Sequence, residues 1–186
     1  MKRTLVPVLA AMAGALASFG AQAADGTITI NGTITDSTCS INGAASGTAA
    51  DSTVTLPSVP AGALSSTGAT AGTSNPSDIR FSLTGCTGSA TKAVARFENG
   101  PTVDQATGNL VNQAGTGAAG NVQVQLLNSQ RQPINITTNA NNDAATSGVD
   151  ITSGNADLTY FGRYYATGAA TAGAVSTSVQ YTMDYQ

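Results

Sequence analysis

The sequence contains no histidine and no tryptophan, and charged residues make up only 9% of it. Without histidine, a serine triad of the usual type cannot be built. The net charge of −3 disfavours binding to nucleic acid or to anionic membrane surfaces. No paired carboxylates, glycine-rich phosphate loop or metal-ligating cluster stands out in the sequence. We therefore expect no enzyme activity, no cofactor and no metal site.

Long apolar runs are also scarce, because only one occurs, at residues 5–19. A basic pair at positions 2 and 3 precedes it, and the small-x-small sequence Ala21-Gln22-Ala23 follows it. This order is typical of a secretory signal peptide, and the run is shorter than the roughly 20 residues that a membrane span needs. We predict a signal peptide at residues 1–23 and a single exported domain after it.

The exported chain has only two cysteines, Cys39 and Cys86. In an oxidising compartment, a lone pair of cysteines is most simply one disulfide. A crosslink that closes a loop of this length is expected to stabilise the fold by roughly 4 kcal/mol. A metal or a catalytic thiol is disfavoured, because neither a histidine nor a Cys-x-x-Cys sequence accompanies the pair.

Helical patterns of convincing length are absent, and short alternating runs separated by Gly, Ser, Asn and Pro predict an all-β sandwich. The predicted strands are residues 53–56, 79–83, 92–97, 121–127, 134–138, 157–166 and 175–185. Between them we expect long loops of low complexity.

The stretch DGTITINGTIT, residues 25–35, alternates strictly, as a half-buried strand does. Ile28, Ile30 and Ile34 share one face with Gly32, so a glycine interrupts the apolar side. One interpretation is an ordinary first strand with a bulge at Gly32. The other is a strand that completes a neighbouring molecule.

The last predicted strand, VSTSVQYTMDYQ, also alternates, and the sequence ends one residue beyond it. Its residues of one parity are Val175, Thr177, Val179, Tyr181, Met183 and Tyr185. We interpret it as a core strand with no later strand to cover its edge. The sandwich is therefore expected to lack a strand.

Three stretches resemble the type 1-like pilin subunits of chaperone–usher fimbriae. GTITINGTITDSTC resembles that family's N-terminal extension and first cysteine, and GNVQVQLLNSQRQPI its central strand and turn. YFGRYYATGAATAGAVSTSVQYTMDYQ resembles its C-terminal portion, including the penultimate tyrosine. The resemblance implies an incomplete immunoglobulin-like β-sandwich that lacks its C-terminal strand and is completed by donor-strand exchange.

The resemblance also assigns roles to residues. Residues 24–36 become a donor-strand extension in front of a pilin domain at residues 37–186. The residues expected to enter a neighbour's groove are Ile28, Ile30, Gly32 and Ile34. Those expected to line the acceptor groove and to contact the chaperone are Val179, Tyr181, Met183 and Tyr185.

The function that the resemblance implies is that of a structural pilus-shaft subunit that supports cell adhesion. The implied partners are identical or related pilin subunits, a periplasmic pilus chaperone and an outer-membrane usher. The implied route leads through the periplasm to an extracellular cell-surface fimbria. Two alternatives stay open: a minor or adaptor fimbrial subunit, and a self-contained secreted Ig-like binding domain.

Overall fold

A computed structural model describes residues 38–186. The predicted signal peptide at 1–23 and the predicted extension at 24–36 lie outside the described residues. The helical elements are η1 (Ala61–Leu64) and α1 (Ala144–Ser147). The strands are β1 (Thr38–Ile41), β2 (Thr70–Ala71), β3 (Ile79–Thr87), β4 (Lys92–Phe97), β5 (Leu110–Val111), β6 (Val122–Leu127), β7 (Val149–Asp150), β8 (Asn155–Ala166) and β9 (Tyr181–Tyr185).

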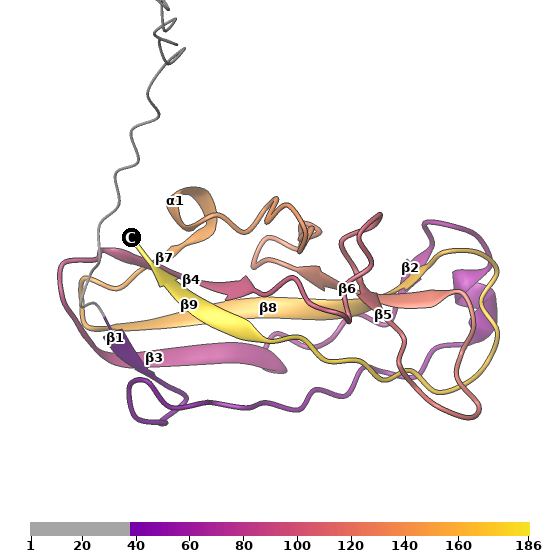
Figure 1. Ribbon diagram of the computed structural model, residues 1–186, viewed down its shortest axis with the longest axis horizontal. Coiled ribbons are helices and arrows are strands. Elements are labelled where there is room, and N and C mark those ends of the chain that lie inside the picture. Colours follow the sequence, from indigo (N-terminus) through magenta and orange to yellow (C-terminus); the bar gives the residue numbers. More distant parts are fainter. Residues whose placement is uncertain (1–37) are drawn as a thin grey trace, which may run out of the picture. The chain divides into compact units, whose positions relative to one another are not determined.

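The strands form two antiparallel sheets that pack on each other (Figure 1). The larger sheet has the order β1-β3-β8-β6-β5, with β2 also paired to β8, and the smaller sheet has the order β7-β4-β9. The fold is an immunoglobulin-like sandwich that lacks one strand. No helix within residues 38–186 is long and apolar enough to cross a membrane.

The core lies between the two sheets and is built from the inward residues of β3, β4, β6 and β8. Alternation in these strands places side chains such as Leu83, Val94, Leu126 and Leu158 in the interior, each at most 4% exposed. A smaller apolar cluster includes Leu64, the last residue of η1, with Ala119, Val122 and Ala166. The main core between the sheets holds the small sheet, and therefore β9, against the large sheet.

One edge of β4 is closed by side chains where its neighbouring strand stops. The strand β7 pairs only with Lys92 and Ala93. Beyond it, the Ala95 N–H donates to the Tyr160 hydroxyl at 3.0 Å, and the Asn142 amide donates to the Ala95 carbonyl at 2.9 Å. These two side chains satisfy buried backbone groups that would otherwise be costly.

We expect Tyr160→Phe to destabilise the fold by about 1–3 kcal/mol at neutral pH, because the Ala95 N–H stays buried without a partner. Burial raises the pKa of Tyr160 to about 12. Because this pKa lies above the unfolded-state value of about 10, the protonated hydroxyl contributes roughly 2–3 kcal/mol to the free energy of unfolding. The contribution is complete below pH ~10 and is lost as the pH rises through ~12.

Urea unfolding from pH 7 to pH 12 checks this expectation. The difference in the free energy of unfolding between the wild type and Tyr160→Phe should decrease above pH 10, because only the wild type carries this hydroxyl. Other tyrosines titrate in both proteins and therefore cancel in the difference. A difference in the free energy of unfolding that stays constant over this pH range would contradict the assigned role of Tyr160.

Candidate functional site: an open strand edge

One edge of β9 has backbone groups that pair with no other described residue. Its other edge pairs with β4, where Val94 lies opposite Asp184. Lys92 and Gln186 exchange two backbone hydrogen bonds of 2.8 and 2.9 Å. Opposite residues in an antiparallel pair alternate between bonded and non-bonded pairs. The even-numbered residues therefore direct their backbone groups to β4, and the odd-numbered residues direct theirs to the open side.

The open side continues past the start of β9 toward residue 175. The Ser176 N–H donates to the Asn112 side chain at 3.0 Å, and the Gln113 N–H donates to the Ser176 carbonyl at 2.7 Å. Even-numbered Ser176 thus keeps the pattern of β9. The odd-numbered residues from 175 to 185 form no backbone hydrogen bond within residues 38–186. We call the backbone of residues 175–185 the acceptor edge.

The side chains of the acceptor edge alternate between half-buried and exposed. The half-buried ones, which we call the inward row, are Val175, Thr177, Val179, Tyr181, Met183 and Tyr185. The even-numbered side chains between them are all exposed. The row packs against the main core but is not covered by it. It is the half-finished surface of a sheet that continues no further among the described residues.

A second unpaired backbone edge runs along the other side of the gap, at residues 49–57 (Figure 1). Val54 and Leu56 are half-buried, and Thr53 and Thr55 are exposed. The segment has the alternation of a strand, yet its backbone groups form no backbone hydrogen bond with any other described residue. We call it the facing segment.

Two tyrosines of the inward row reach across the gap between these edges. The Tyr181 hydroxyl donates to the carbonyl of Ala50 in the facing segment at 2.8 Å. The Tyr185 hydroxyl accepts the N–H of Cys39 at 3.2 Å. The Tyr181 ring also packs on Phe81, with 4.5 Å between ring centroids. Each tyrosine links β9 to the opposite side of the gap.

These contacts set the width of the gap. An extended tyrosine side chain plus one hydrogen bond covers about two strand spacings of ~4.8 Å each. A gap of this width accommodates one inserted strand, which would pair with the acceptor edge on one side and with the facing segment on the other. The tyrosine rings would lie beneath that strand.

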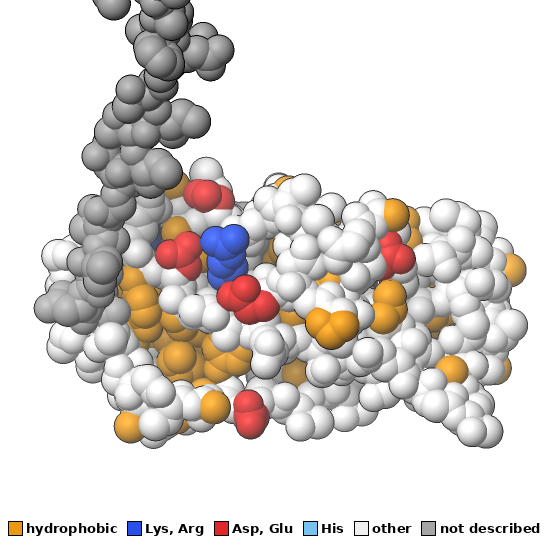
Figure 2. Space-filling model, in the orientation of Figure 1, with side chains coloured by type: hydrophobic (Ala, Val, Ile, Leu, Met, Phe, Trp, Pro, Cys, Tyr) orange, Lys and Arg blue, Asp and Glu red, His pale blue; other side chains and the backbone are white. Residues whose placement is uncertain are grey.

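The floor of the gap is apolar. Figure 2 shows hydrophobic side chains gathered in the lower left of the molecule, between β9 and the segment below it. The half-buried residues packed on the core include Leu56 of the facing segment and Val179 and Met183 of the inward row. An uncovered apolar surface of this kind marks an interaction site.

The pKa values of both tyrosine hydroxyls at the gap are raised. Burial raises the pKa of Tyr181, and the nearby carboxylate of Asp51 raises it further. Burial also raises the pKa of Tyr185. A tyrosine hydroxyl is protonated at neutral pH even without these shifts, and the raised pKa extends to higher pH the range over which the Tyr181 hydroxyl can donate to Ala50.

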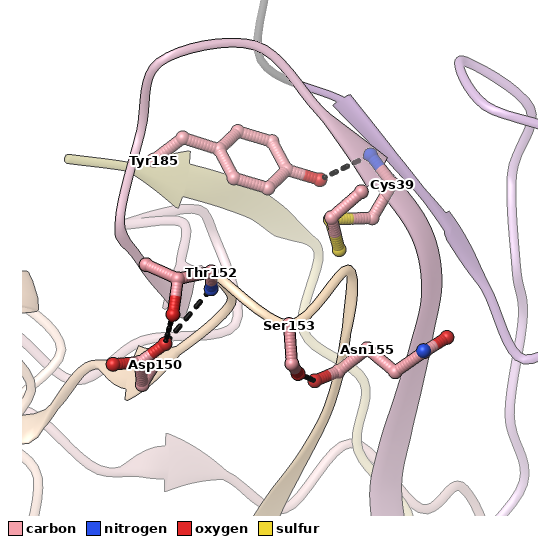
Figure 3. Close-up of a disulfide and its surroundings, with 7 residues drawn as sticks. Cys39, Asp150, Thr152, Ser153, Asn155 and Tyr185 are labelled. Carbon is pink, nitrogen blue, oxygen red and sulfur yellow. Dashed lines mark hydrogen bonds between the residues drawn. A yellow bond between two sulfur atoms is a disulfide. The ribbon is translucent and has the colours of Figure 1, made fainter.

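The expected disulfide between Cys39 and Cys86 is present, and it ties β1 to β3. Figure 3 shows Cys39 beside Tyr185, with the hydrogen bond from the Cys39 N–H to the tyrosine hydroxyl. The disulfide therefore anchors the side of the gap that faces the C-terminal end of β9. It adds to the β1–β3 pairing that positions the Cys39 N–H opposite the Tyr185 hydroxyl.

The structure brings Val179, Tyr181, Met183 and Tyr185 together in one row, while the proposed donor residues from Ile28 to Ile34 lie outside the described residues. Sequence reasoning did not include the facing segment or Thr177 in the site. The alternation of residues 53–56 was a usable signal, but an alternating run does not reveal whether it has a partner.

Within residues 38–186, no group of three or more His, Cys, Asp or Glu side chains is arranged to hold a metal ion. The chemistry available at the gap is instead that of backbone hydrogen bonding and apolar burial.

Residues 56–186 match the family model described as type-1 fimbrial protein A. The chain is 44% identical to the major fimbrial subunit SMF-1 of Stenotrophomonas maltophilia, over 92% of this chain and 98% of that protein. Among solved structures, a Burkholderia pseudomallei antigen and type I fimbria protein aligns with a TM-score of 0.54 and 26% identity, covering 81% of this chain and 97% of that one.

A chain from the structure of a chaperone–usher pilus aligns with a TM-score of 0.56 at 20% identity, covering 88% of this chain and 96% of that one, which supports the fold. The chain has an open sandwich fold, and its sequence matches the family over most of its length. This chain belongs to the type-1 fimbrial protein family and is a structural subunit of a fimbria.

Proposed function

We propose that this chain is the repeating shaft subunit of a chaperone–usher fimbria, and that each copy inserts residues 25–35 as a strand into the gap of the next copy. The observation that carries the proposal is the pair of unpaired backbone edges, residues 175–185 and 49–57, on either side of an apolar floor. Strand addition to such an edge is a recurring way of binding an extended segment.

The proposed donor segment matches the gap in length and in pattern. Residues 25–35 and residues 175–185 contain the same number of residues. In an extended strand, Ile28, Ile30 and Ile34 all point to one face, where they can cover the inward row. The threonines on the other face suit a surface exposed to water.

The energetics favour a joint that opens slowly. Fully burying three isoleucine side chains contributes roughly 5–9 kcal/mol. Each backbone hydrogen bond made to the two open edges adds about 0.5–1.5 kcal/mol net. An inserted strand also removes an edge that would otherwise be free to aggregate.

The resemblance to chaperone–usher subunits supplies the rest of the proposal. The signal peptide at residues 1–23 directs export, residues 24–36 form the donor extension, and residues 37–186 form the acceptor domain. A periplasmic chaperone fills the gap before assembly, and an outer-membrane usher delivers the subunits to the growing extracellular fibre. The role is structural, and no catalytic step is involved.

Replacing Gly32 with leucine tests the proposal. We expect this variant to be exported and disulfide-bonded but to form few or no fibres, because a large side chain enters the face that packs on the gap. Overpacking costs about 1–3 kcal/mol, which corresponds to a roughly 5- to 150-fold weaker joint. Electron microscopy and the amount of fimbrial protein sheared from cells measure the effect.

Thr33→Leu is the matched control, because the same side chain is then added one residue later, on the opposite face of the strand. It should assemble normally. Normal fibre yield from Gly32→Leu, or equal defects in both variants, would refute insertion of this face.

A further inference from the structure

Arg163 lies on the outer face of the large sheet and has no carboxylate partner within residues 38–186. Tyr160 of β8 packs into the core, so the odd-numbered residues Phe161 and Arg163 face away from it. The Nε and Nη2 groups of Arg163 donate to the amide oxygen of Gln125 on the neighbouring strand, at 3.0 and 2.7 Å. Burial lowers the pKa of Arg163. A neutral amide therefore fixes this guanidinium group in a place where a carboxylate would be the stronger partner.

Arg131 is a second arginine beside it without a carboxylate partner among the described residues. Its guanidinium carbon lies 5.0 Å from the centroid of the Phe161 ring, in a cation–π contact. Phe161 precedes Arg163 by two residues on the same face of β8. The two guanidinium groups are therefore neighbours on one surface, and we call Arg131 and Arg163 the arginine pair.

The backbone of the turn that carries Arg131 is held in an unusual conformation. Arg131 has a positive φ of 60°, which is uncommon for a residue with a long side chain. The Asn128 side chain accepts the N–H groups of Gln130 and Gln132, at 3.0 and 2.9 Å, and so fixes the turn on both sides of Arg131. Backbone outliers that the surrounding structure maintains are often associated with function.

The arginine pair occurs in a chain in which acidic groups predominate. The sequence has 10 acidic and 7 basic side chains, and the single ion pair within residues 38–186 joins Arg80 to Asp157. Most carboxylates of the described chain are therefore outside ion pairs. Guanidinium groups are well suited to bind carboxylates through paired hydrogen bonds, so the chain itself offers many suitable anions.

A surface of complementary charge lies on the other side of the sandwich, on the outer face of the small sheet. A hollow there is lined by Glu98 and Asp184, together with Arg96 and Thr182. Neither Glu98 nor Asp184 forms an ion pair within residues 38–186. Figure 2 shows acidic side chains around a basic one over β4 and β9. We call this surface the acidic hollow.

Opposite faces of one molecule cannot touch each other, but they can meet between different copies. This chain is a structural subunit of a fimbria, so many copies lie close together. A contact between two different faces is heterologous, and it can be repeated from copy to copy without closing a ring. Charge complementarity between the two faces therefore favours a second copy of this chain as the partner of the arginine pair.

We propose that the arginine pair binds the acidic hollow of a second copy and so connects copies face to face in the fibre. This contact is additional to the joint between consecutive copies, and it does not depend on which segment makes that joint. Because the ion pairs are at the surface, salt should weaken the contact.

Crosslinking of fibres made from an Arg131→Lys variant of the full chain tests the contact directly. The sequence otherwise has only Lys2 and Lys92, so the variant adds one reactive amine and keeps the positive charge. A carbodiimide joins an amine to a carboxylate in contact with it. It should produce covalent dimers in which mass spectrometry finds position 131 linked to Glu98 or Asp184, a link that wild-type fibres do not form.

Charge reversal measures the strength of the contact. Arg131→Glu combined with Arg163→Glu should weaken it roughly 2- to 30-fold, because two exposed ion pairs are lost. The fibres should become thinner and more flexible in electron microscopy, while the amount of sheared fimbrial protein stays unchanged. Adding Glu98→Arg and Asp184→Arg to the same chain should restore the width. Wild-type fibres in 1 M salt should resemble the charge-reversed fibres, because the Debye length then falls to about 3 Å.

Two variants control for folding and for net charge. Arg131→Glu alone changes only an exposed side chain, so it keeps the test informative if Arg163→Glu prevents export. Arg80→Glu combined with Asp157→Arg exchanges the ion pair on the same face of the large sheet and should leave the fibres unchanged.

The absence of crosslinked dimers, or links from position 131 only to carboxylates outside the acidic hollow, would overturn the proposal. A charge exchange that does not restore the width would do the same. Fibres of normal width that lose binding to acidic glycans would assign the arginine pair to a glycan instead of a second copy. Failure of the proposed function is a separate result, because it would appear as fibres that still form after residues 25–35 are deleted.

Discussion

Deleting residues 25–35 is expected to abolish fibre formation while export and disulfide formation continue. The deletion removes the three isoleucines that we propose to cover the neighbour's gap, and with them roughly 5–9 kcal/mol per joint. The acceptor edge at 175–185 and the facing segment at 49–57 stay intact. The truncated subunit should therefore accept a strand but not donate one.

A subunit that accepts a strand but cannot donate one has a measurable effect on fibre formation and fibre length. Produced alone, the truncated chain should yield no fibres by electron microscopy. Produced together with the full chain, it should shorten the fibres in proportion to its share, because each copy that is incorporated ends growth in one direction. A variant that keeps the length of the segment but replaces it with Gly and Ser should behave like the deletion.

A matched variant checks that the apolar face carries the effect. Serine at the outward positions Thr27, Thr29 and Thr33 leaves all three isoleucines in place and should leave the fibres unchanged. Fibres of normal length from the deletion variant would contradict donation by this segment. A self-contained secreted Ig-like domain would then be the better account.

Replacing Cys39 and Cys86 together with alanine should lower the melting temperature of the mature subunit by about 8–16 °C. The disulfide joins residues 47 apart in sequence, and a loop of that size is stabilised by roughly 4 kcal/mol. In a domain of this size, each 1 kcal/mol corresponds to about 2–4 °C. The yield of subunit in the periplasm should fall as well.

The same variant should also weaken the joint, because the crosslink fixes the position of β1, whose Cys39 backbone N–H donates to the Tyr185 hydroxyl at one end of the gap. Calorimetry and quantification of sheared fibres measure the two effects separately. Ser40→Ala, a change beside the disulfide that leaves it intact, is the control. An unchanged melting temperature in the cysteine variant would mean that the crosslink has no structural role.

Much of the sandwich could be predicted from local pattern. The strand predicted at residues 92–97 has the same bounds as β4, and those predicted at 121–127 and 157–166 differ by one or two residues from β6 and β8. Alternation and β-branched residues mark these strands because each is buried on at least one face. The disulfide was predictable because the sequence contains only two cysteines.

The prediction of a strand at residues 134–138 was wrong. The structure has turns there, with isolated bridges at Pro133 and Asn135. The Asn135 side chain accepts the Thr138 N–H at 3.0 Å, and Asn139 adopts a positive φ of 57°. Asparagine side chains that bond to nearby backbone favour turns over ladders, and this local chemistry outweighed the apolar pattern.

The runs at 53–56 and 175–180 have a strand's alternation but no ladder among the described residues. Alternation reports only that one face is buried, whereas a strand also requires a partner for its backbone. That partner depends on which distant segments come together, and it cannot be inferred from either run alone.

The sequence by itself determined the all-β class, the single disulfide and the family resemblance, because each depends on local pattern or on composition, and the export signal stays a prediction from the same kind of pattern. Only the tertiary structure decided which edge is open among the described residues and how Tyr181 and Tyr185 reach across the gap beside it. Those features arise from the register between strands far apart in the chain, and register is set by packing in three dimensions.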